Sequence, residues 1–180
     1  MRLFISINSN DETRSALLSV QGTIKPQTKK GSFTRPENLH LTLAFLGETK
    51  EETIPLICSV IDNAIQKYTP PFHLVFSKVG YFKRFNKELW WIGINHTNPY
   101  LKTLKDIRQK ITDGLSEKNI DFDTKQFKPH ITLGREIEQD SPIAVPDQNI
   151  NFPVRRISLM KSERINGILT YTEIFGVELG

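Results

Sequence analysis

The chain has 180 residues, of which 38% are hydrophobic and 24% are charged. This balance is typical of a globular protein and excludes a largely disordered chain. No apolar run approaches the roughly 20 residues of a membrane helix, and the first residues, MRLFISIN, are typical of a strand and not of a signal peptide. The net charge of +4 is compatible with a polyanionic partner without indicating one.

The length favours a single domain over residues 1–180. The one cysteine, Cys58, cannot form an internal disulfide, and it lies among apolar residues at helical spacing, where we expect it to be buried. A reducing, cytoplasmic setting fits this cysteine content.

Strand and helix patterns alternate along the chain. In chain order we predict a strand over 2–7, a helix over 11–21 capped by Asn10 or Asp11, a basic loop over 22–36 with a short strand around Phe33, a strand over 39–46, a helix over 51–67, strands over 72–79 and 89–95, a helix from Pro99 to about Lys118, a strand over 130–135, a proline-containing surface loop over 136–153, and strands over 154–161 and 170–179. Neither a Gly-rich phosphate loop nor a G-x-G-x-x-G motif is present.

One tetrapeptide pattern occurs twice. His40-Leu41-Thr42-Leu43 and His130-Ile131-Thr132-Leu133 are 90 residues apart, and each lies in a predicted strand. Each half of the chain also contains a long predicted helix. This repetition predicts two similar lobes, related by an approximate two-fold axis, that place the two strands side by side. A group bound between the strands would then meet one histidine from each side.

Alternation along a strand assigns the side chains of both motifs to two faces. We expect one face to carry a histidine, a hydroxyl and a small residue that leaves room for a ligand, and the other face to be apolar. On the ligand face we place His40, Thr42 and Ala44 of the first motif and His130, Thr132 and Gly134 of the second. On the apolar face we place Leu39, Leu41, Leu43 and Phe45 of the first motif and Ile131 and Leu133 of the second.

These residue types are suited to acid–base chemistry on a phosphate. One imidazole can take a proton while the other gives one near neutral pH. The threonine hydroxyls can donate hydrogen bonds to non-bridging phosphate oxygens. A single His-x-Thr in a strand is common and usually structural, whereas two copies, each following a proline (Pro36 and Pro129), favour a function. The arrangement requires no metal and no cofactor, and the spacing does not decide which histidine is the acid.

Two longer segments resemble known signatures. PENLHLTL followed by FLGE, within residues 36–48, and FKPHITLGR, residues 127–135, resemble those of the 2H phosphoesterase superfamily. Within it they are most similar to the RNA 2′,3′-cyclic phosphodiesterases, also called LigT-type 2′-5′ RNA ligases. The beginning, Met1–Ile5, and the ending, with Leu159–Ser162, Gly167 and Tyr171, also resemble this family, so the likeness covers essentially the whole chain.

The resemblance implies an α+β bilobal 2H phosphoesterase fold with pseudo-two-fold duplication, in which two antiparallel sheets line a central cleft and helices lie outside. It implies hydrolysis of an RNA 2′,3′-cyclic phosphate end to a 2′-phosphate. By position, His40 would donate a proton to the leaving O3′, His130 would accept one from water, and Thr42 and Thr132 would contact the phosphate. We expect the partner to be an RNA or oligonucleotide end, with no membrane association, and the protein to be a monomer.

Further residues are candidates for substrate binding. Arg135 ends the second motif at an odd spacing from His130, so regular alternation would put the two side chains on opposite faces of the strand. A residue at a strand end can nevertheless turn toward a cleft, so a phosphate contact and a surface charge are equally favoured. Lys128 could steer an RNA backbone, and Phe33 or Tyr171 could stack a base. For Phe82 we favour core packing.

The same site admits other substrates. Alternatives are 2′-5′-linked oligonucleotides, a small cyclic nucleotide, or ligation of RNA ends. A non-enzymatic alternative is an RNA-end-binding module, against which the intact histidines and threonines of both motifs argue. The loops 22–36, 80–88 and 136–153 would discriminate among these substrates, and their sequences do not indicate which one applies.

Overall fold

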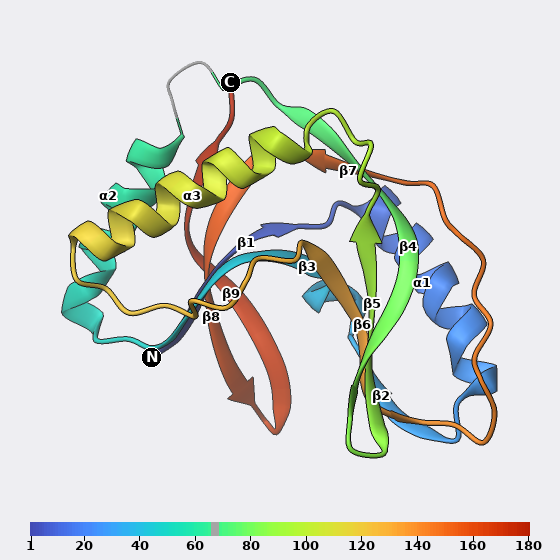
Figure 1. The fold of residues 1–180 in the computed structure, drawn as a ribbon. Helices are drawn as coiled ribbons and strands as arrows, with labels where there is room; N and C mark the ends of the chain where they lie inside the picture. The colour runs from blue at the N-terminus through green and yellow to red at the C-terminus, as the bar shows by residue number, and fades with distance from the viewer. Residues whose placement is uncertain (66–68) are drawn as a thin grey trace.

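A computed structural model describes residues 1–65 and 69–180. Within these ranges, nine strands form one curled sheet with the order β7-β4-β5-β6-β3-β1-β8-β9, and β2 pairs with β6 beside this path (Figure 1). The strands are β1 (Arg2–Asn8), β2 (Lys30–Phe33), β3 (His40–Glu48), β4 (Phe72–Arg84), β5 (Lys87–Ile94), β6 (His130–Glu138), β7 (Ile150–Val154), β8 (Arg156–Ile165) and β9 (Ile168–Glu178), and the helices are α1 (Asp11–Ile24), α2 (Ile54–Ala64) and α3 (Leu101–Glu117).

The sheet consists of two halves that meet where β3 lies beside β6. Leu41 of β3 pairs there with Ile131 of β6. From this seam, the order β3-β1-β8-β9 on one side matches the order β6-β5-β4-β7 on the other, and all these neighbours are antiparallel. The α+β fold with antiparallel strands in two similar halves is therefore confirmed, and the two histidine motifs lie at its centre.

The helices cover the outer faces and exchange between the halves. Helix α1 follows β1 in the chain but packs against β6 and β7, while α3 follows β5 but packs against β3 and α2 (Figure 1). The predicted cap of α1 is confirmed, because the Asn10 side chain accepts a hydrogen bond of 2.8 Å from the Thr13 N–H. Within the described ranges, no helix is long and apolar enough to cross a membrane.

Several predicted boundaries are wrong. Strands β4 and β5 extend into the predicted loop over 80–88 and form a hairpin, because their polar residues find partners across the two strands. Strand β6 continues to Glu138 and β7 begins at Ile150, so the predicted loop over 136–153 is shorter. The predicted helix over 51–67 is a 3-10 turn, Glu51–Thr53, followed by α2; its predicted end at Lys67 lies outside the described residues. Cys58 is half-buried at the edge of the core.

A β-bulge interrupts the alternation at the same place in both motif strands. In β3, Thr42 pairs with Ser6 and Ala44 with Ile5, so Leu43 is the extra residue. In β6, Thr132 pairs with Trp91 and Gly134 with Trp90, so Leu133 is the extra residue. Each bulge shifts the following residues to the opposite face.

The bulges overturn part of the predicted face assignment. Ala44 lies opposite the fully buried Ile5 and is itself buried, and Gly134 lies opposite the buried Trp90. These two small residues therefore face the core and leave no room for a ligand. Phe45, which was expected in the core, is half-buried on the same face as Phe4.

Candidate functional site

The register at the seam brings both motifs together. Because Leu41 pairs with Ile131 in an antiparallel arrangement, His40 is opposite Thr132 and Thr42 is opposite His130, all on one face of the sheet. The two histidines are thus diagonal neighbours, a relation that corresponds to roughly 7–8 Å between positions in an antiparallel pair. The four motif residues from two halves of the chain form one group.

Both imidazoles are held in the same way. The Nδ1 atom of His40 lies 2.6 Å from the carbonyl oxygen of Asn38, and Nδ1 of His130 lies 2.5 Å from that of Lys128. A carbonyl oxygen only accepts, so each Nδ1 carries the hydrogen and donates it. In the neutral imidazoles Nε2 therefore bears the lone pair, and both rings are oriented to exchange a proton through Nε2.

The threonine of the first motif contacts its own histidine. Thr42 Oγ1 lies 2.9 Å from His40 Nε2, and because this nitrogen is unprotonated in the neutral ring, the hydroxyl donates to it. A proton on Nε2 would reverse this hydrogen bond and release the hydroxyl hydrogen for another acceptor. Thr42 is therefore linked to the protonation state of His40.

The surroundings hold the pKa of both histidines below its ordinary value. Burial is the main cause of the lowering to about 4 for His40, with further lowering by Arg135 and His130, while the bond to Asn38 opposes it. For His130 burial again lowers the pKa most, Arg135 adds to this, and the bond to Lys128 opposes it. Both rings are consequently neutral near pH 7 in the free protein.

Aromatic rings surround each imidazole. The Phe4 ring lies 4.9 Å from that of His40, and Tyr171 meets His40 edge-on at 5.3 Å. On the other side, Phe82 lies 6.0 Å from His130. Tyr171, a candidate from the sequence, is thus brought to the site, and burial raises the pKa of its hydroxyl. These rings cover part of each imidazole and contribute to its burial.

Phe82 corrects an expectation, because it does not pack into the core. Its side chain is 41% exposed on the open face, where its ring lies 5.3 Å from that of Trp91. Trp91 lies flat over Gly80, at which a Cβ atom would come within 2.6 Å of the indole. The glycine therefore makes space for the tryptophan beside His130.

Arg135 faces the site because of the bulge at Leu133. Without that extra residue it would point to the core side, as its parity suggested. After burial, its positive charge is the next influence that lowers the pKa of either histidine. Of the remaining candidates, Phe33 packs against the core with the Lys25 ammonium 5.3 Å from its ring centroid, and exposed Lys128 contributes its backbone carbonyl.

Polar side chains from two helices support the bulges from behind. The carbonyl oxygen of Leu43 accepts a hydrogen bond from Arg108 Nε of α3 at 3.2 Å. The carbonyl oxygen of Leu133 accepts one from Gln21 Nε2 of α1 at 2.9 Å. Sequence reasoning missed both residues, since nothing in a helical pattern indicates that a polar side chain will reach a bulged strand.

Comparison with known proteins identifies the family. Residues 7–91 match the family model described as LigT like phosphoesterase. An RNA 2′,3′-cyclic phosphodiesterase of Methanocaldococcus jannaschii is 30% identical over 137 residues, which are 75% of this chain and 71% of that protein. The chain belongs to the LigT-like phosphoesterase family. An RNA 2′,3′-cyclic phosphodiesterase of Thermotoga maritima is 28% identical over 96% of this chain and 89% of its own.

The fold of this LigT-like phosphoesterase matches that of a solved relative. The crystal structure of Escherichia coli LigT complexed with 3′-AMP has a TM-score of 0.79 and 26% identity, covering 99% of this chain and 96% of that one. The family assignment places the protein in the 2H phosphoesterase superfamily, as the two signatures indicated. Among the residues that the structure describes, no three His, Cys, Asp or Glu side chains gather as metal ligands.

Proposed function

We propose that this LigT-like phosphoesterase hydrolyses the 2′,3′-cyclic phosphate at an RNA end, giving a 2′-phosphate and a free 3′-hydroxyl. The observation that carries the proposal is the matched pair of imidazoles. Each donates its Nδ1 hydrogen to the carbonyl two residues earlier and keeps Nε2 for proton exchange, on opposite sides of one seam. The names of the relatives support the choice of substrate.

The reaction needs one base and one acid in line with the phosphorus. His130 Nε2 takes a proton from water as the water oxygen attacks phosphorus. The P–O3′ bond breaks on the opposite side, and a protonated His40 Nε2 gives its proton to O3′. The ring of the cyclic phosphate already holds the leaving oxygen in place, so orientation and proton transfer are the main demands on the protein. The division of roles between the histidines follows the family resemblance.

Substrate binding supplies the charge that His40 needs. In the free protein burial lowers the pKa of His40 to about 4, so its ring is neutral near pH 7. A phosphate anion beside Nε2 favours the charged form and raises this pKa. The Thr42 hydroxyl, which donates to Nε2 in the free protein, is then able to donate to a non-bridging oxygen. His40 thus becomes an acid in the presence of the anion.

Thr132 and Arg135 complete the proposed phosphate contacts. Thr132 lies opposite His40 in the register and carries the second hydroxyl. Arg135 brings a guanidinium whose planar donors match two phosphate oxygens. Together with Thr42 they would offset the negative charge that grows on the non-bridging oxygens as water attacks.

The test is an assay with a nucleoside 2′,3′-cyclic phosphate and a short RNA ending in one, in the presence of EDTA. We expect a 2′-phosphate product that forms without added metal. His40→Ala and His130→Ala should each lower kcat by at least about 100-fold, whereas exposed His73→Ala, a matched control on β4, should leave it unchanged. Near-normal turnover in His40→Ala or His130→Ala would remove that histidine from the mechanism. Loss of wild-type activity in EDTA that only added metal restores would reject the metal-independent route. A 3′-phosphate product would reject the assigned leaving oxygen.

A further inference from the structure

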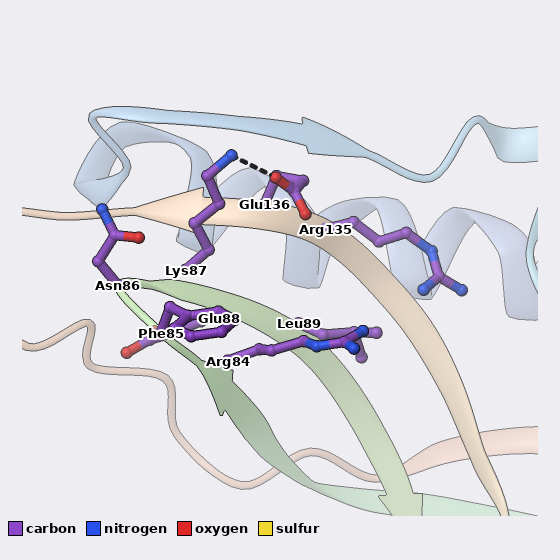
Figure 2. Close-up of a pocket in the computed structure, with 8 residues that line it drawn as sticks. All are labelled: Arg84, Phe85, Asn86, Lys87, Glu88, Leu89, Arg135 and Glu136. Carbon is purple, nitrogen blue, oxygen red and sulfur yellow. Dashed lines mark hydrogen bonds and ion pairs between the residues drawn. The ribbon is translucent and has the colours of Figure 1, made fainter.

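A cavity of about 540 Å³ is lined by residues that, apart from Arg135, have no part in the mechanism above. It is formed by the tip of the β4–β5 hairpin and the bulged end of β6 (Figure 2). Arg135 is one of its walls, and the charge of this residue also acts on both histidines. The cavity therefore shares Arg135 with the proposed site for the reacting phosphate.

The register of the hairpin places a second arginine on the same face. Phe82, which lies beside His130, pairs with Leu89, and Arg84 pairs with Lys87. Since residues two apart on a strand share a face, Arg84 follows Phe82 along the open face at a distance of roughly 7 Å. Figure 2 shows the guanidinium groups of Arg84 and Arg135 extending toward the same side.

These two guanidinium groups have no ion-pair partner among the residues that the structure describes. Within the described part of the chain, no ion pair joins Arg84 or Arg135 to a carboxylate. The two carboxylates of the cavity wall are otherwise engaged. Glu136 pairs with Lys87, and Glu88 is 5% exposed and accepts a hydrogen bond of 2.9 Å from Trp90 Nε1. Two free positive charges beside one cavity fit an anionic ligand.

The tip of the hairpin carries an aromatic side chain in an unfavourable conformation. Phe85 and Asn86 are the two turn residues between the paired Arg84 and Lys87, and Phe85 has φ +58°. This position in a two-residue hairpin turn favours glycine, and a bulky residue there is strained. The Phe85 side chain is 92% exposed, so packing within the protein does not offset the strain. An exposed ring among cationic side chains is suited to stacking with a nucleobase.

We propose that the tip of the β4–β5 hairpin is a subsite for the penultimate nucleotide of an RNA strand, the one on the 5′ side of the nucleotide that carries the cyclic phosphate. In this proposal, which rests on the proposed function, Arg135 contacts the cyclic phosphate and Arg84 binds the phosphodiester that links the last two nucleotides. Phe85 stacks the base of the nucleotide on the 5′ side. The protein is thereby selective for oligonucleotide ends over mononucleoside cyclic phosphates.

The test compares kcat/KM on a dinucleotide that ends in a 2′,3′-cyclic phosphate with kcat/KM on the mononucleoside cyclic phosphate. We expect the wild-type ratio to exceed about ten and Arg84→Ala to lower it about tenfold or more, since a charge-assisted hydrogen bond is lost. The matched control is Lys83→Ala, because Lys83 is an exposed cation of the same strand with the opposite parity and is absent from the cavity wall. A dinucleotide with an uncharged methylphosphonate linkage should show a low ratio in the wild type and no further loss in Arg84→Ala.

Phe85→Gly separates stacking from stability. Removal of the strained side chain should leave the thermal midpoint unchanged or higher, and should lower the same ratio severalfold. A ratio unchanged in Arg84→Ala would overturn the phosphate subsite, and one unchanged in Phe85→Gly would remove the base contact. If cleavage of the mononucleoside substrate depends on His40, but Arg84→Ala has the wild-type ratio of the two kcat/KM values, the subsite proposal is rejected and the proposed function stands. If neither substrate is cleaved, the proposed function fails.

Discussion

The low pKa of His40 should make the stability of the protein depend on pH. The pKa of the His40 imidazole is about 4 in the native state, against an ordinary value of 6.5, with burial as the main cause. The unfolded chain therefore binds a proton at a pH where the native state does not. The stabilising effect of the neutral native ring is complete above pH 6.5, and it is lost as the pH falls toward 4.

The expected magnitude is large enough to measure. A difference of 2.5 units between 6.5 and 4 corresponds to about 3 kcal/mol in total. Between pH 7.5 and 4.5 the free energy of unfolding should fall by about 2.5 kcal/mol on account of this one group. His130 adds a loss of the same sign, because its pKa is also lowered, chiefly by burial.

Urea unfolding of the wild type and of His40→Gln at the two pH values isolates the His40 contribution. The amide variant has no titrating ring, so its stability should change by about 2.5 kcal/mol less than that of the wild type over this interval. His73→Gln, at an exposed position on β4, is the matched control and should retain the full wild-type change. An NMR titration of the imidazole C–H resonances gives the His40 pKa directly, and saturating inorganic phosphate should raise it. A His40 pKa at or above 6.5, or equal pH dependence in His40→Gln and the wild type, would refute the reasoning.

Three further predictions concern Arg135, the bulges and cooperativity. Arg135→Ala should lower kcat/KM by about 10- to 100-fold and raise the pKa of both histidines, because one positive charge that acts on them is lost. Arg135→Lys should keep the histidine pKa values low in the same NMR titration. Unchanged kinetics in Arg135→Ala would contradict a phosphate contact. Gln21→Met leaves the Leu133 carbonyl without its side-chain donor and should cost about 1–3 kcal/mol in urea unfolding together with a fall in kcat, whereas intact kcat at reduced stability would restrict Gln21 to a structural role. Calorimetry should give one cooperative unfolding transition for residues 1–180, as expected for a single domain, because α1 and α3 each join both halves, and two separate transitions would contradict this.

The meeting of the two histidines could be predicted from the sequence because it depends on local alternation. As far as Thr42 and Thr132, alternate residues do share a face, and the repeat correctly suggested adjacent strands. Beyond those threonines the alternation fails at the bulges. Their position is determined by pairing with β1 and β5 and by hydrogen bonds from α1 and α3, which are contacts distant in sequence. This explains why the faces of Ala44, Gly134 and Phe45 were predicted wrongly.

The β4–β5 hairpin escaped prediction for a related reason. Its turn residues, Phe85 and Asn86, lack the glycine that usually marks a two-residue turn, and the flanking residues are polar. The strand is formed by cross-strand partners such as the pair of Arg84 and Lys87, so no local pattern reveals it. The exposure of Phe82 follows from this extension, because it places the ring on the open face.

The exchange of helices between the two halves has a consequence for synthesis of the chain. Helix α1 is complete by Ile24, but the strands that it covers, β6 and β7, end at Glu138 and Val154. A ribosome produces the chain from its N-terminus, so the apolar side of α1 lacks these two strands until most of the protein has been made. Leu17, Val20 and Ile24, all buried in the finished fold, therefore form an apolar surface that is open to aggregation or chaperone binding in the nascent protein.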